Sequence, residues 1–228
     1  MALAEYHRLA DLFEYPQEGY LERVNAARAF VVEEYPHAGH WLDTFVELLP
    51  KGELRDIQEL YTRSFDVQAI TTLDIGYVLF GEDYKRGEFL ANIMREHRLV
   101  GNDCGAELGD HLPNLLRLLP QLEDTDLAEE IVQQILVPAL RKMIGEFDGP
   151  LMAKKDANYK LHHKTLIEAN EETRLVFLNV LHVLYDILES DFELKSQPLI
   201  EHSSDFLKSL HVELTLENPT GKLHLPTW

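Results

Sequence analysis

Residues 175–188 read LVFLNVLHVLYDIL, and this stretch decides the fold. Apolar side chains lie on nearly every side of a helix drawn through it, which we expect to extend from about residue 171 to residue 191. A helix that is apolar all round is usually buried in the centre of a protein. The run has only 14 residues and contains Asn179, His182 and Asp186, so it is too short and too polar to cross a bilayer.

The segments outward from this helix are also helical in pattern. Residues 127–144 place apolar side chains three and four positions apart, with a possible capping box at Asp126 and Glu129 and a kink or break expected at Pro138. Shorter helices are expected over residues 3–13, 20–34, 39–49 and 54–65. Residues 211–216 alternate weakly, and the proline-containing end reads as extended or mobile. The sequence therefore predicts an all-α, single-domain helical bundle over residues 1–210 and a tail over 211–228.

The composition excludes several classes of function. The chain has 228 residues and 45% apolar content, which is enough for a substantial core. Forty acidic residues against 21 basic ones give a formal charge of −19, so nucleic acid and anionic membranes are unsuitable partners. This charge suits either solubility alone or the attraction of a basic partner segment. Cys104 is the single cysteine, and the first residues lack a basic, apolar signal pattern, so we expect a cytoplasmic protein.

Motifs for catalysis are missing from the sequence. It contains no nucleophile elbow, no phosphate-binding glycine loop and no HExxH motif. His162 and His163 are adjacent, so they point to different faces of a helix, while His182 has Asp186 one turn away but no second histidine nearby. We therefore expect no enzymatic activity, no cofactor and no metal site.

Two short polar motifs interrupt the apolar pattern between residues 61 and 87. YTRSFD places Tyr61 and Phe65 on one helix face with Asp66 just beyond, which could equally be a core aromatic pair followed by a turn aspartate. GEDYKRG, residues 81–87, has the acids of a first helical turn. Gly87 would weaken a helix by about 1 kcal/mol, so we expect it to permit a close approach by a neighbouring helix.

A third polar motif, ELGDHLP, occupies residues 107–113. Asp110 suits the N-cap of a helix whose first turn contains Pro113, and a good helix start would explain both residues. That explanation does not account for the grouping of Glu107, Asp110 and His111 at the end of a long loop.

Together the three motifs resemble the family of delta-subunit assembly chaperones of respiratory nitrate reductase, within the wider family of maturation chaperones of molybdenum enzymes. The resemblance covers about residues 60–119, and the opening LADLFEYP is also similar. The chain departs from the family pattern at Tyr77 and Val78, where a Glu-His pair is expected. The residues that carry the resemblance are Tyr61, Phe65, Asp66, Gly81, Glu82, Arg86, Gly87, Glu107, Leu108, Asp110, His111, Leu112 and Pro113.

The resemblance implies a bundle of the molybdoenzyme-chaperone type that acts as a monomer or homodimer. Its partner would be the apo catalytic subunit of a molybdenum oxidoreductase, with nitrate reductase as the first candidate, including that subunit's N-terminal segment. The chaperone would hold this client competent for molybdenum cofactor insertion and membrane docking.

Such a client suits a groove with an apolar floor and a charged rim. We assign the floor to Tyr61, Phe65, Tyr84, Leu112 and Leu116, and the rim to Asp66, Glu82, Glu107 and Asp110. Arg86 would organise these acids, and His111 would tune release because imidazoles titrate near neutral pH.

Two alternatives belong to other classes of function. One is a helical metal-dependent hydrolase that uses carboxylates and histidines for phosphohydrolase chemistry. The other is an oligomeric scaffold, for which the sequence offers only its apolar helices.

Overall fold

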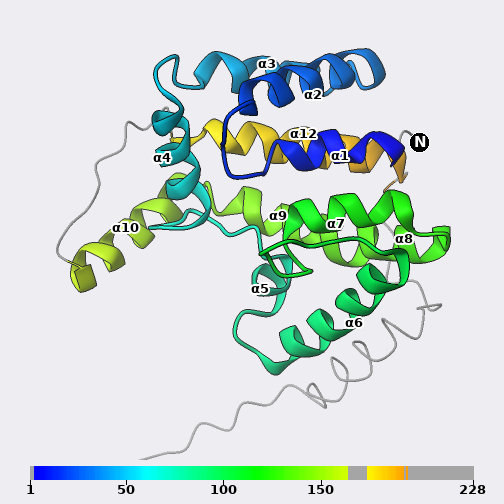
Figure 1. Cartoon of the computed structure of the whole chain (residues 1–228). Coiled ribbons are helices and arrows are strands. Elements are labelled where there is room, and N and C mark those ends of the chain that lie inside the picture. The colour runs from blue at the N-terminus through cyan, green and yellow to red at the C-terminus, as the bar shows by residue number, and fades with distance from the viewer. Residues whose placement is uncertain (1–2, 164–173, 193, 195–228) are drawn as a thin grey trace, which may run out of the picture.

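The structure is a computed structural model that describes residues 3–163, 174–192 and 194. All regular elements in this part of the chain are helical, so the predicted all-α class is confirmed (Figure 1). The predicted boundary after residue 210 and the alternating residues 211–216 lie outside the described residues. The α-helices are α1 (Tyr6–Asp11), α2 (Tyr20–Glu34), α3 (Gly39–Leu48), α4 (Leu54–Phe65), α5 (Ile75–Phe80), α6 (Tyr84–Val100), α7 (Leu112–Leu118), α8 (Thr125–Ile131), α9 (Val137–Gly145), α10 (Gly149–His163) and α12 (Val176–Asp191).

Helix α12 forms the centre of the bundle, as its apolar composition predicts. It packs against α3 and against α9, which lie on opposite sides of it (Figure 1). Its polar residues are held by aromatic donors. The Tyr6 and Tyr35 hydroxyls donate to Asp191 Oδ2 over 2.9 and 2.7 Å. The fully or nearly fully buried side chains of α12 are Val176, Phe177, Val180, Leu181, Val183, Leu184, Ile187 and Leu188.

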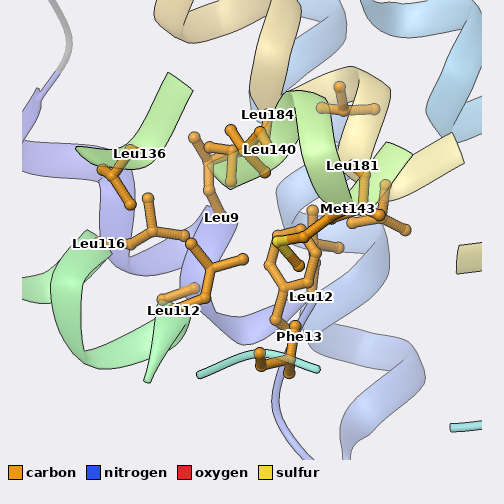
Figure 2. Close-up of a cluster of buried hydrophobic side chains, with 14 of the residues drawn as sticks. Leu9, Leu12, Phe13, Leu112, Leu116, Leu136, Leu140, Met143, Leu181 and Leu184 are labelled. Atoms are coloured by element: carbon orange, nitrogen blue, oxygen red, sulfur yellow. The ribbon is translucent and has the colours of Figure 1, made fainter. Parts of the chain in front are cut away.

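A leucine-rich layer joins α1 to α7 and α9. Figure 2 shows Leu9 and Leu12 from the α1 segment meeting Leu112 and Leu116 from α7. Leu140 of α9 lies beside them, and the buried leucines of α12 complete the cluster. Burial of a leucine side chain contributes about 1.5–3 kcal/mol, so this layer fixes α7 firmly to the core.

The predicted break near Pro138 is confirmed. A π-helical turn, Val132–Leu136, separates α8 from α9, and Pro138 lies at the start of α9. Proline supplies no backbone donor, which explains why the regular ladder of helical hydrogen bonds is interrupted before it.

The capping box predicted at Asp126 is wrong. Asp124 caps α8 instead, because its Oδ1 accepts from the backbone N–H groups of Asp126 and Leu127.

The other boundaries are close to those predicted. Helices α2 and α4 span the predicted residues, and the segment predicted as one helix over residues 3–13 is a 3-10 turn, Leu3–Glu5, followed by α1. Helix α5 is an addition, since its six residues lie in a stretch for which no helix was predicted. None of the described helices combines the length and apolarity needed to span a membrane.

Candidate functional site

Segments 73–75 and 110–112 lie side by side and bring the polar motifs together. Asp74 and His111 form an isolated antiparallel bridge. The Ile75 N–H donates to the Asp110 carbonyl over 3.0 Å, and the Leu112 N–H donates to the Leu73 carbonyl over 2.9 Å. The bridge joins the start of α5 to the start of α7, so motif residues far apart in sequence become neighbours.

Four ionisable side chains gather around this bridge, and we call Asp74, Arg86, Asp110 and His111 the polar cluster. Asp74 accepts from two of them, Arg86 Nη2 at 3.2 Å and His111 Nδ1 at 3.2 Å. The His111 hydrogen bond, followed by the positive charges of His111 and Arg86, holds the pKa of Asp74 below its usual value, although partial burial opposes this. The Arg86 guanidinium also lies over the Tyr77 ring, 5.3 Å from its centroid.

Asp110 is the buried member of the polar cluster, with a fully covered side chain. Its Oδ2 accepts from the Gly76 N–H at 3.0 Å and lies 3.8 Å from Arg86 Nε, which is too long for a hydrogen bond. Among the described residues, neither Asp110 Oδ1 nor Arg86 Nε has a hydrogen-bond partner. Burial and then the nearby Asp74 carboxylate raise the pKa of Asp110, and Arg86 and the backbone donors counteract them only partly.

Gly76 is the glycine that this site requires. A Cβ there would lie 2.7 Å from Asp110 Oδ2 and 2.9 Å from Phe89 Cδ1, so a side chain cannot be added without displacing one of them. The close approach predicted at Gly87 is wrong, because a Cβ built on Gly87 meets nothing within 4 Å among the described residues.

Four carboxylates act electrostatically on Tyr61, whose O–H donates to the Phe13 carbonyl at 2.9 Å. The pKa of Tyr61 is raised, first by burial and then by the negative charges of these carboxylates. We call these four carboxylates the acidic face: Glu14, Asp66, Asp74 and Glu107. Asp66 and Glu107 are exposed, whereas Glu14 pairs with Arg117 at 2.6 Å.

The predicted apolar floor is mostly core. Leu112 and Leu116 are fully buried, and Tyr61 and Phe65 are 8% and 7% exposed, so these four side chains pack inside the protein and line no surface groove. Tyr61 and Phe65 form the predicted aromatic pair, at 5.1 Å between ring centroids. Tyr84 differs, because 61% of it is exposed at the start of α6.

The four residues assigned to the acidic rim differ in exposure. Asp66, Glu82 and Glu107 are exposed, while Asp110 is buried and lies on no rim. Asp110 does not cap α7 either, since its carboxylate accepts from Gly76 and the N-cap position is occupied by His111.

Loop 101–111 is held by a buried polar network that the sequence did not reveal. His97 is 1% exposed, and its Nε2 and Nδ1 lie 2.9 Å from the Gly109 carbonyl and 2.8 Å from Asn102 Nδ2. Because a carbonyl can only accept and an amide nitrogen can only donate, His97 must be neutral with its proton on Nε2. Burial lowers the pKa of His97 accordingly. Asn114 Nδ2 also donates to the Cys104 and Leu108 carbonyls.

Across the described part of the chain, no three His, Cys, Asp or Glu side chains converge in a group that could hold a metal ion. Comparison of the chain with protein-family models and with curated proteins finds no match.

Proposed function

We propose that this protein is an assembly chaperone that binds the apo catalytic subunit of a respiratory molybdenum enzyme, with nitrate reductase as the first candidate. It would act in the cytoplasm and hold the subunit competent for molybdenum cofactor insertion and membrane docking. The motif resemblance suggests this function, and one observation carries it further. Arg86 of the second motif meets Asp110 and His111 of the third around Asp74, and carboxylates of the first and third motifs, Asp66 and Glu107, both act electrostatically on Tyr61.

The acidic face favours a client segment that is positively charged. Its carboxylates come from four separate segments, and together they oppose ionisation of Tyr61. Asp66 and Glu107 are exposed and free to attract a basic segment of a client from solution. The net charge of −19 extends the same attraction over longer distances.

Exposed aromatic side chains lie at the neighbouring α5–α6 hairpin. Tyr77 and Tyr84 are 43% and 61% exposed, and Glu82 beside them is exposed as well. Tyrosines that are both apolar and able to hydrogen-bond are common anchors in protein interfaces. The proposed client surface therefore consists of acidic side chains and tyrosines, in place of the groove with a leucine floor that the sequence suggested.

Calorimetric titration with the N-terminal peptide of a nitrate reductase catalytic subunit tests the acidic face. Asp66→Lys and Glu107→Lys should each weaken binding by about 1 kcal/mol, or roughly fivefold, since each reverses an exposed charge that faces the peptide. Glu33→Lys is the matched control, because Glu33 is exposed on α2 and belongs to none of the motifs. Unchanged affinity in both variants, or an equal loss in the control, would contradict the assignment of the peptide to this face.

A further inference from the structure

The polar cluster lacks one positive charge. It contains two carboxylates, Asp74 and Asp110, but Arg86 is its only permanent cation. With both acids ionised, the two carboxylates and Arg86 sum to −2 + 1 = −1 before any charge on His111 is counted. A net charge is costly where water is excluded, and here the Asp110 side chain is fully buried.

Two buried polar atoms of the polar cluster are also unpaired. Asp110 Oδ1 and Arg86 Nε both lack hydrogen-bond partners among the described residues. Buried polar atoms are nearly always paired, so an unpaired carboxylate oxygen beside an unpaired donor calls for an explanation. A proton on the Asp110 carboxyl removes the excess charge without moving any helix.

The titratable groups of the polar cluster and the acidic face are mostly acids. Asp110 is acted on by Asp74, which precedes α5, and by Arg86 of α6, while the adjacent His111 turns its Nδ1 to Asp74. The remaining acids of the acidic face, Glu14, Asp66 and Glu107, act together with Asp74 on Tyr61. Tyr77 of α5 contributes only its ring to Arg86.

We propose that the polar cluster holds one exchangeable proton, on the buried Asp110 carboxyl, and that a cationic group of a bound client segment displaces it. The second half of this statement rests on the proposed chaperone function. A client cation supplies the same charge as the proton, which then leaves to the buffer. Client capture is therefore favoured as pH rises, and release as pH falls.

Calorimetry in buffers of different ionisation enthalpy measures the displaced proton directly. The N-terminal peptide of the candidate catalytic subunit is titrated at one pH in phosphate and in Tris, and the difference in heat gives the number of protons released. We expect about one proton per peptide for the unmodified protein and close to none for Asp110→Asn. Asp126→Asn is the matched control, since Asp126 is exposed on α8, and it should release as many protons as the unmodified protein. Peptide binding without proton release overturns the exchange but leaves the chaperone function standing.

A second measurement needs no client. The native state binds more protons than the unfolded state wherever the folded pKa of Asp110 is raised, so this group makes stability fall as pH rises through that folded pKa. The urea midpoint of Asp110→Asn should therefore rise relative to that of the unmodified protein as the pH increases from the ordinary carboxyl pKa of 3.8 through the raised folded pKa, while that of Asp126→Asn follows the unmodified protein. Parallel curves for all three proteins would overturn the proton site even if no peptide binds. Asp110→Ser, which also removes the titrating carboxyl, provides the same comparison if Asp110→Asn does not fold.

Discussion

The imidazole of His182 lies stacked against the indole of Trp41, with 4.4 Å between the ring centroids and 12° between the planes. The indole Nε1–H of Trp41 also donates to Asp186 Oδ2 at 2.9 Å. His182 and Asp186 are one turn apart on α12, so a single side chain from α3 contacts both. This pair of contacts fixes the register between the central helix and its neighbour.

Replacement of Trp41 by phenylalanine keeps an aromatic ring but removes the donor to Asp186. We expect a loss of about 1–2 kcal/mol in the free energy of unfolding, because a half-buried carboxylate loses its partner. Urea denaturation of Trp41→Phe, Asp186→Leu and the double variant measures the coupling. The double variant should lose less than the sum of the two single changes, and strict additivity would mean that the hydrogen bond contributes nothing.

The effect of His97 on folding stability should change with pH in the opposite direction to that of Asp110. Its folded pKa lies below the ordinary value of 6.5, so the unfolded chain takes up a proton first as the pH falls. The stability that His97 contributes is present above pH 6.5 and declines as the pH falls below it. The difference in urea midpoint between the unmodified protein and His97→Gln should therefore narrow from pH 7 to pH 5. His7→Gln, at an exposed histidine, should show no such change, and a constant difference for His97→Gln would disprove the neutral assignment.

Gly76 and Gly87 form a matched pair for testing the packing around the polar cluster. Gly76→Ala forces a Cβ against Asp110 Oδ2 and the Phe89 ring, and we expect a loss of about 1–3 kcal/mol. Gly87→Ala adds a methyl group to open space on helix α6, and it should stabilise the protein by about 0.5–1 kcal/mol. Thermal or urea unfolding distinguishes these outcomes, and equal effects at the two positions would contradict the close approach at Gly76.

The fold could be predicted from sequence where a long periodic pattern decides it. Helix α12 was identified as central because few exposed helices are apolar all round, and the ranges predicted for α2 and α4 match the structure. Helix α5 could not be predicted, since six residues reading IGYVLF carry no helical period. Its position depends on the bridge between Asp74 and His111, which joins residues 37 positions apart.

The burial of the residues chosen for the candidate site could be predicted only in part. Sequence does not distinguish a leucine that lines a groove from one that fills a core, so Leu112 and Leu116 were assigned to a surface. Asp110 was assigned to a rim because a carboxylate is normally exposed. Its burial depends on the Gly76 N–H, which lies 34 positions earlier in the sequence. The exposed acids Asp66 and Glu107 followed the ordinary rule and were placed correctly.

The most direct test of the chaperone function is affinity capture by the full chain from cells grown anaerobically with nitrate. The retained protein is identified by mass spectrometry, and its molybdenum content is measured. The account predicts the catalytic subunit of a molybdenum oxidoreductase, retained without its cofactor and lost with an Asp66→Lys, Glu107→Lys double variant that keeps its helical circular dichroism. Retention of no such subunit by the folded protein, or equal retention by the double variant, would contradict the account.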